Sequence, residues 1–316
     1  MIETLGLRRV FKARRRSVEA VAGVDLAVQR GEIFGFLGPN GAGKTTTLRM
    51  LATLLPPSSG AASVAGYDLL RRPQDVRKRI GYVAQGGGSA PEISGRSELI
   101  FQARLYGFSH DQARQRAQIL IDSLELSSCA DRRVQTYSGG QRRRLDLAVG
   151  LIHEPSLVFL DEPTTGLDPQ SRAHLWDEVR RLRERGMTIF LTTHYLEEAD
   201  SLCDRLAIID QGRIVAEGTP DALKRQVSGD SVVLAASDME AALAVLRQAP
   251  FVRHAESDQD SGTVRLYVEH GEARLLDVLR LIEGSGLDLL SIAVSRPSLD
   301  DVFLRQTGRS LRDGAQ

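Results

Sequence analysis

Short, continuous apolar runs alternate with stretches of helical spacing over residues 24–217. The runs that we expect to form strands are "EIFGFLG" (32–38), "RIGYVAQ" (79–85), "SLVFLDEP" (156–163), "MTIFLTTH" (187–194) and "RLAIIDQGRIVAEG" (205–218). The stretch "KTTTLRMLATLL" (44–55) has helical spacing and is expected to stop at Pro56 and Pro57. Continuous apolar strands separated by helices predict a parallel sheet that is covered on both faces. Ligands of such sheets bind beyond the carboxyl ends of the strands.

The pattern changes after the polar stretch "GTPDALKRQVSGD" (218–230). Strands are expected at 231–236, 251–256, 263–269 and 287–294, helices at 238–248 and 272–284, and a short capped helix at 297–308. The order β-α-β-β-α-β is typical of a small α+β, ferredoxin-like unit. We therefore expect two domains, residues 1–225 and residues 230–316.

Composition narrows the class of protein without assigning a function. The chain has 316 residues, of which 42% are hydrophobic and 26% are charged, as in an ordinary soluble globular protein. The chain has 41 basic and 41 acidic residues, so its net charge is zero and does not attract nucleic acid. We therefore expect no nucleic acid as a partner. The N-terminus lacks the apolar region of a signal peptide, and no apolar run is long enough to span a bilayer. If the protein serves a membrane, we expect it to act from the surface, through a partner.

The first candidate site is the glycine-rich stretch "GPNGAGKTT" (38–46), between an expected strand and an expected helix. Its Gly38, Gly43, Lys44 and Thr45 fill the phosphate-loop pattern G-x-x-x-x-G-K-[ST]. The backbone N–H groups would cradle phosphate oxygens, and Lys44 would reach the β- and γ-phosphates. Thr45 would supply a hydroxyl to Mg²⁺, and Thr46 is placed for the α-phosphate. The alternative, a simple glycine turn, does not explain the lysine.

Polar side chains follow three further strands. Asp161 and Glu162 end the run "LVFL", where adjacent carboxylates are poorly explained by packing. One can hold Mg²⁺ while the other orients or deprotonates a water molecule. Gln85 follows "GYVA", where it can coordinate the metal or the water, and His194 follows "IFLTT". Each of these alone can be an ordinary polar strand end, but together with the phosphate loop they favour a catalytic site.

A second glycine-rich helix start lies at "YSGGQRRR" (137–144). Ser138 is a good N-cap, and Gly139 and Gly140 allow close approach of the backbone to an anion. The arginines at 142–144 oppose the helix dipole, so they form either a solvated basic face or the response to a negative ligand. With no lysine, this cradle should bind no nucleotide alone. It would serve as half of a site, closing over a phosphate that Lys44 of another copy holds.

Together these motifs resemble the ATP-binding cassette (ABC) family. The order is Walker A at 38–46, the Q-loop at Gln85, the signature at 137–141, Walker B at 157–163, the D-loop at 166–168 and the switch residue His194. The resemblance implies a P-loop NTPase cassette, with a RecA-like core and a helical subdomain. It also implies a head-to-tail dimer that holds two ATP molecules with Mg²⁺. The implied nucleotide contacts are Gly38, Pro39, Asn40, Gly41, Ala42, Gly43, Lys44, Thr45, Thr46, Ser138, Gly139, Gly140, Gln141 and Asp168. The implied metal contacts are Thr45, Gln85 and Asp161, and the implied catalytic residues are Glu162, His194, Gln85 and Lys44.

Two features depart from this pattern or leave it open. Tyr137 stands where the signature usually has leucine, although the anion-contacting residues are intact. Phe11 is the best-placed aromatic residue to stack on adenine, and the basic segment "KARRRS" follows it. The alternative for Phe11 is an ordinary residue of the N-terminal core.

The tail narrows the resemblance further. The stretch "SRPSLDDVFLRQTGR" (295–309) and the continuation "RRRLDLA" of the signature resemble daunorubicin-resistance-type ATPases, the energy subunits of ABC-2-type exporters. This resemblance implies a separately encoded membrane permease as partner. It implies a peripheral position on the cytoplasmic face of the cell membrane and a cargo of drugs, antibiotics or lipid-like compounds.

Two other classes of function stay open at this point. One is a soluble cassette ATPase that acts on nucleic acid or ribosomes, although such proteins generally contain two cassettes or a long coiled coil. The other is a nucleotide-binding regulator without hydrolysis, against which Glu162 and His194 argue.

Overall fold

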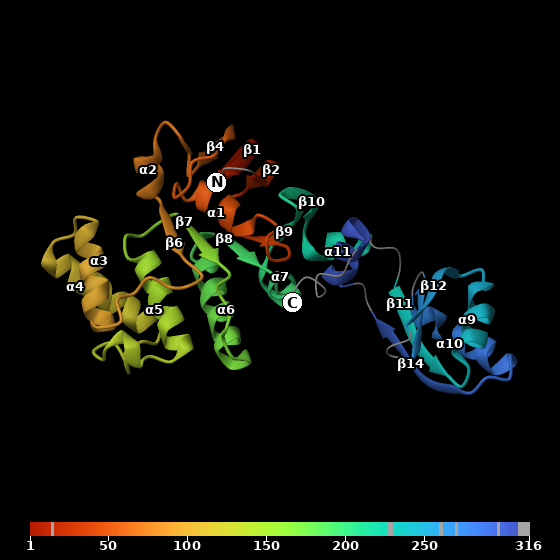
Figure 1. The fold of residues 1–316 in the computed structure, drawn as a ribbon. Helices are drawn as coiled ribbons and strands as arrows, with labels where there is room; N and C mark the ends of the chain where they lie inside the picture. The colour runs from red at the N-terminus through yellow and green to blue at the C-terminus, as the bar shows by residue number, and fades with distance from the viewer. Residues whose placement is uncertain (14–15, 227–229, 259–261, 269–270, 296–297, 309–316) are drawn as a thin grey trace. The chain divides into compact units, whose positions relative to one another are not determined.

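The computed structural model describes residues 1–13, 16–226, 230–258, 262–268, 271–295 and 298–308 (Figure 1). The chain divides into two compact units, Met1–Pro220 and Asp221–Ser310, and each is described here by itself. Among the described residues, none of the helices is both long enough and apolar enough to cross a membrane. Residues 14–15 of the basic segment, and 296, 297 and 309 of the tail motif, lie outside the described part.

A six-stranded sheet forms the centre of the first unit. Its strands are β3 (Ile33–Leu37), β6 (Ile80–Val83), β7 (Leu157–Asp161), β8 (Thr188–Thr193), β9 (Arg205–Asp210) and β10 (Arg213–Gly218). The order is β10-β9-β3-β8-β7-β6, and all neighbours are parallel except the edge strand β10, which pairs antiparallel with β9. The predicted parallel sheet is confirmed, with the run at 205–218 folded into a hairpin. The carboxyl ends of β3, β8, β7 and β6 are therefore neighbours at one edge.

The helices of this unit include α1 (Lys44–Leu51), α2 (Pro73–Arg77), α6 (Pro169–Glu184) and α7 (Leu196–Leu202). Helix α1 ends four residues before the predicted position. Thr53 adopts a left-handed φ of 62°, and the N–H groups of Leu54 and Leu55 both donate to the carbonyl of Arg49. The chain thus leaves the helix before it reaches the prolines. The spacing of apolar residues does not predict this early end, because the spacing continues up to Leu55.

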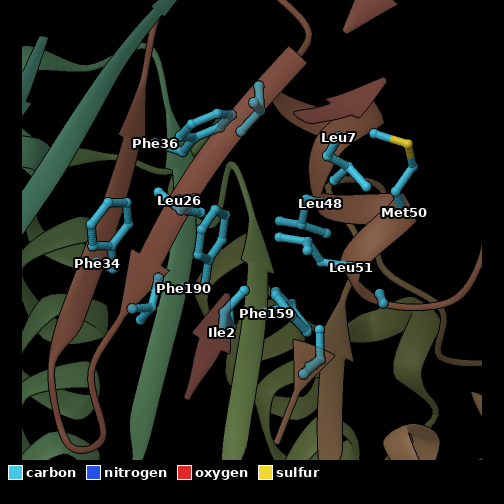
Figure 2. Close-up of a cluster of buried hydrophobic side chains, with 14 of the residues drawn as sticks. Ile2, Leu7, Leu26, Phe34, Phe36, Leu48, Met50, Leu51, Phe159 and Phe190 are labelled. Atoms are coloured by element: carbon cyan, nitrogen blue, oxygen red, sulfur yellow. The ribbon is translucent and has the colours of Figure 1, made fainter. Parts of the chain in front are cut away.

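A second, antiparallel sheet is formed by strands that come before and after β3 in the sequence, and no strands were predicted in these segments. It contains β1 (Ile2–Ala13), β2 (Arg16–Val28), β4 (Ser59–Val64) and β5 (Tyr67–Asp68), in the order β2-β1-β4-β5. One hydrophobic core joins this sheet to the large sheet and to α1 (Figure 2). Ile2, Leu7 and Leu26 of the small sheet pack in the same cluster as Leu48 of α1 and Phe190 of β8. The burial of these large side chains holds α1 against the large sheet.

Three helices make up the predicted helical subdomain: α3 (Gly95–Leu105), α4 (His110–Ser123) and α5 (Gly139–Leu151). Figure 1 shows α3 and α4 side by side. Ser94, Ser109 and Ser138 cap the three helices, because each side chain accepts a hydrogen bond from a backbone N–H three residues on.

The second unit has the predicted ferredoxin-like order. Its elements are β11 (Asp230–Ala236), α9 (Met239–Arg247), β12 (Val252–Asp258), β13 (Thr263–Val268), α10 (Gly271–Gly284) and β14 (Leu289–Ser295), with α8 (Pro220–Gln226) before them and α11 (Leu299–Thr307) after them. The antiparallel sheet has the order β12-β13-β11-β14. Its apolar face, with Val232, Leu234 and Leu266, packs with Leu246 of α9 and Ile282 of α10. A separate core therefore supports this unit.

Candidate nucleotide site

The phosphate loop joins the end of β3 to the start of α1, as predicted. Gly43 has a left-handed φ of 104°, and a Cβ atom at this position would lie 2.4 Å from the carbonyl oxygen of Ala20. Only glycine fits there without strain. Among the described residues, no side chain caps α1, and its first turn contains no acidic residue. The N–H groups at this helix start are therefore oriented for an anion.

Lys44 is folded back over the loop. Its side chain is 4% exposed, and Nζ donates to the carbonyl oxygens of Gly38 (2.7 Å) and Pro39 (3.0 Å). Nζ also lies 3.3 Å from Oε1 of Glu162. Burial lowers the pKa of Lys44, and the charge of Glu162 opposes this shift. The lysine thus stands at the point where the phosphate loop and the Walker B strand meet.

Asp161 and Thr45 form the candidate metal site. Asp161 is buried at the end of β7, and its Oδ1 accepts hydrogen bonds from Oγ1 of Thr45 (2.9 Å) and of Thr192 (2.8 Å). Among the described residues there is no group of three or more His, Cys, Asp or Glu side chains that would bind a metal by themselves. A carboxylate beside a hydroxyl fits Mg²⁺, which is usually held by one or two carboxylates together with substrate phosphates and water.

Glu162 lies at the centre of the polar groups, and its backbone is strained. Its φ is 45°, a left-handed value that is uncommon for a residue with a side chain, and strain of this kind gathers at functional sites. Its N–H donates to the carbonyl and the hydroxyl of Thr192 (3.1 and 3.0 Å), which holds the segment in this conformation. The side chain accepts hydrogen bonds at Oε2 from Nε2 of Gln85 (2.9 Å) and from Oγ1 of Thr165 (3.3 Å).

His194 completes this group from the end of β8. Its Nδ1 lies 3.2 Å from Oε2 of Glu162, without the alignment of a hydrogen bond. Burial alone would raise the pKa of Glu162, but the closeness of His194 and the charge of Lys44 outweigh it and lower the pKa to about 2. Glu162 is therefore a carboxylate at neutral pH, and it lies between Lys44 and the imidazole of His194.

A cavity of about 350 Å³ opens in front of these groups. Its lining consists of Ala20, Asn40, Gly41, Gly43, Lys44, Thr45, Thr46, Gln85 and Glu162. Gly38, Pro39 and Ala42 are buried in the loop beneath it, and Asp161 lies behind Thr45. Among the described residues, Phe11, Asp168, His194 and the segment Ser138–Gln141 do not contribute to this lining, although His194 contacts Glu162, which does. One copy thus brings together the Walker, Q-loop and switch residues, but not the signature and the D-loop.

The signature segment instead forms the exposed start of α5. Oγ of Ser138 accepts from the N–H of Gln141 (3.2 Å), and Oε1 of Gln141 accepts from the N–H of Ser138 (3.1 Å), which is a capping box. The unusual Tyr137 donates a hydrogen bond from its hydroxyl to the carbonyl of Cys129 (2.7 Å). The tyrosine therefore anchors the segment to the helical subdomain and leaves Ser138 and Gly139 exposed.

The three arginines after the signature differ in how deeply their side chains are buried. The interpretation as a solvated basic face is wrong for Arg143, which is 8% exposed and turned into the protein. Arg144 lies 3.3 Å from Glu125, and Arg142 is half-buried. Arg143 was not among the functional residues predicted from the sequence. The available signal was Asp146, a charge three residues later inside the otherwise apolar run "LDLAVGLI".

Asp168 and Phe11 both lie at the surface. Asp168 caps α6, because its carboxylate accepts from the N–H (2.9 Å) and the hydroxyl (2.7 Å) of Ser171. Phe11 is 40% exposed, so it is not an ordinary residue of the N-terminal core. The guanidinium of Arg9 lies over its ring at 4.7 Å. The role of Phe11 in adenine stacking stays a prediction.

Residues 21–165 match the family described as ABC transporter, and residues 218–307 match the family described as ATP-binding protein DrrA1-3-like, C-terminal domain. The chain is 44% identical over 316 residues to the daunorubicin/doxorubicin resistance ATP-binding protein DrrA of Streptomyces peucetius, covering 99% of this chain and 94% of that protein. It is 42% identical over 297 residues to the Nod factor export ATP-binding protein I of Burkholderia lata, covering 93% of each. A dimeric ATP-binding cassette solved in a post-hydrolysis state, bound to ADP and Pi, matches with a TM-score of 0.65 at 23% identity, over 69% of this chain and 98% of that one.

The chain belongs to the ATP-binding subunits of ABC transporters and carries a C-terminal domain of the DrrA type. It is accordingly an ATPase whose hydrolysis is coupled to transport. The P-loop NTPase fold that the sequence predicted is confirmed.

Proposed function

We propose that this ATPase drives a separately encoded membrane permease that exports a drug-like, antibiotic or lipid-like compound. The observation that carries the proposal is the convergence of Lys44, Gln85 and His194 on Glu162, which lines one cavity together with Lys44 and Gln85. A resistance ATP-binding protein and an export ATP-binding protein are among the relatives, which favours export over a role with nucleic acid or ribosomes. The protein would work at the cytoplasmic face of the membrane, where ATP is available.

We assign the chemistry to the polar edge of the large sheet. Lys44 and the N–H groups of α1 would bind the β- and γ-phosphates, and Glu162 would accept a proton from the attacking water. Gln85 and His194 contact Glu162 and would orient it and the water. When Mg²⁺ is bound, Thr45 and Asp161 would hold it, and the ion would neutralise phosphate charge.

We further propose that two copies share each nucleotide. The cavity lacks donors from Ser138 and Gly140, although both belong to an exposed, glycine-rich helix start that suits a phosphate. A head-to-tail pair would bring this helix start of one copy over the cavity of the other. We assign nucleotide binding to residues 1–225 and an accessory role to the domain of residues 230–316.

Lys44→Ala is expected to weaken or abolish nucleotide use. The ammonium group of Lys44 is a point charge at the phosphate loop, and an apolar side chain cannot replace it. Nucleotide affinity and phosphate release are measured on the purified variant, and Lys78→Ala, which removes an exposed lysine after α2, is the control. Unchanged affinity and turnover in Lys44→Ala would refute the assignment of the cradle.

The surface that we propose for the permease follows the Gln85 loop in the sequence. Helix α3 follows the glycine-rich segment and exposes two large apolar side chains, Phe101 at 53% and Leu105 at 65%. The two residues are four positions apart and so lie one turn apart on the helix, and neighbouring large apolar groups that stay exposed are typical of a contact surface. A partner bound to α3 would be connected to Gln85 through residues 86–94, which join the two.

A photo-crosslinker placed at Phe101 or Leu105 is expected to capture the membrane subunit in the purified complex. A crosslinker at Glu184, which is exposed at the end of α6, is the control and should not capture it. Crosslinked products are identified by mass spectrometry. If crosslinks from residues 86–105 never reach the membrane subunit, the docking surface lies elsewhere.

A further inference from the structure

Helix α5, which begins at the Ser138 cradle, carries a buried arginine with an unusual set of partners. The guanidinium of Arg143 donates to three backbone carbonyls: Ala84 from Nη1 (2.6 Å), Pro163 from Nε (2.7 Å) and Asp161 from Nη2 (3.2 Å). Burial lowers the pKa of Arg143, while the nearby carboxylates of Asp146 and Asp161 oppose this shift. A buried cation is costly unless its donors are used, so these three hydrogen bonds fix its position firmly.

The three carbonyls belong to two segments of the candidate active site. Ala84 immediately precedes Gln85, and Asp161 and Pro163 stand on either side of Glu162. Gln85 and Glu162 meet through a hydrogen bond of 2.9 Å. One guanidinium therefore spans the backbones of both segments and sets the separation at which those two side chains meet.

Asp146 holds the same loop one helical turn further along α5. Its Oδ1 accepts from the hydroxyl of Ser89 (2.8 Å) and from the N–H of Gly88 (3.3 Å). At Gly87, where φ is 73°, a Cβ atom would lie only 2.7 Å from Oδ2 of Asp146. The segment "GGGSA" is flexible by composition, yet this carboxylate fastens it to the helix.

We propose that Arg143 and Asp146 are positioning residues that lock the Gln85 loop and the Glu162 segment to the helix that presents Ser138. This inference rests on the proposed roles of Glu162, Gln85 and Ser138. Because α5 is a continuous helix, a displacement of the Gln85 loop moves its N-terminal cradle as well. The phosphate that Gln85 senses in one site and the phosphate that Ser138 contacts in the other site are thereby mechanically linked.

The test compares turnover with ATP affinity in the full-length chain. Arg143→Met keeps an unbranched stem but loses all three hydrogen bonds, and we expect kcat to fall by about 10- to 100-fold because of the misplaced groups. KM for ATP should change by less than about threefold, since the Lys44 cradle is untouched. Asp146→Ala should also lower kcat. Asp146→Asn, which keeps an acceptor at the same place, should restore most of the loss.

Two comparisons separate positioning from general stability. The double variant Arg143→Met/Asp146→Ala should lose little more turnover than the worse single variant. The reason is that both residues hold the same arrangement of α5 and the two active-site segments. The control is Arg116→Met, since Arg116 is also a shielded arginine and donates to the carbonyl of Ile152 at the other end of α5. It should lower Tm without the same loss of kcat.

A loss of kcat in Arg116→Met that equals the loss in Arg143→Met at the same fall in Tm would overturn the proposal. Unchanged kcat in Arg143→Met, or an effect on KM alone, would overturn it as well. If Arg143→Met does not fold, the Asp146→Ala and Asp146→Asn pair decides by the same criteria. Glu162→Gln is measured alongside as a reference. Full turnover there would refute the role of Glu162, whereas an inactive Glu162→Gln beside a normal Arg143→Met would refute only the positioning role.

Discussion

Glu162→Gln is expected to bind ATP and to lose turnover by about 10²–10⁴-fold, the usual contribution of a general base. Glutamine has nearly the same shape and keeps an oxygen acceptor for Gln85, but it cannot take a proton from water. The carboxylate is ionised at neutral pH, because His194 and Lys44 lower its pKa to about 2 against the effect of burial. Loss of turnover with retained binding would place Glu162 in the chemical step.

The measurements for this variant are ATP affinity and phosphate release on the purified protein. Glu178→Gln is the control, because Glu178 is a buried carboxylate of α6 that pairs with Arg181 (2.6 Å) and does not line the cavity. Near-normal hydrolysis by Glu162→Gln would contradict the assignment. An equal loss of turnover in Glu178→Gln would indicate that removing any buried carboxylate is enough to stop hydrolysis.

Mixing two inactive variants, Lys44→Ala and Ser138→Arg, is expected to restore part of the ATPase activity. In a mixed dimer one composite site carries both lesions and the other carries neither. The expectation follows from the cavity, which holds Lys44 but has no contribution from Ser138 among the described residues. Since each ATP would bridge two surfaces, nucleotide should also raise the affinity of the dimer steeply.

The mixing experiment needs a prior check that one intact site can hydrolyse ATP by itself, because strict coupling would hide the recovery. Each variant is also tested alone at the total protein concentration of the mixture, and dimerisation is followed by sedimentation with and without ATP. Given that check, no recovery on mixing would show that the two cradles are not shared. An ATP-bound enzyme that stays monomeric with its membrane partner would lead to the same conclusion.

The sequence allowed the polar edge of the large sheet to be predicted because one physical rule locates it. Gln85, Asp161, Glu162 and His194 each follow a continuous apolar strand, and strands of that kind are parallel and end at a common edge. The order of the strands was not available from the pattern. Strands β7 and β8, which carry Glu162 and His194 at their ends, are parallel neighbours because the chain crosses back through α6 between them. The spacing of apolar residues within a strand does not encode such a connection.

Other features depend on tertiary contacts that leave little trace in the sequence. Arg143 stands between Arg142 and Arg144, which are half-buried, and apart from Asp146 the only sign of its direction is its contact with the carbonyls of two distant segments. The strands β1 and β2 were not predicted, because the register of their pairing shifts at several points and breaks the alternation of apolar and polar residues. The exposure of Phe11 likewise follows from that hairpin.

The contact between Lys44 and Glu162 has a consequence for the chemistry that we propose. A buried cation is costly unless it has partners, and the carboxylate of Glu162 and the two carbonyls of the phosphate loop together offset the cost of burying Lys44. A phosphate bound by Lys44, as proposed, would compete with Glu162 for the same ammonium group. Because the charge of Lys44 lowers the pKa of Glu162, a weaker contact with the lysine would raise this pKa and make the carboxylate a stronger base. Under the proposal, the substrate would thus strengthen the group that acts on it.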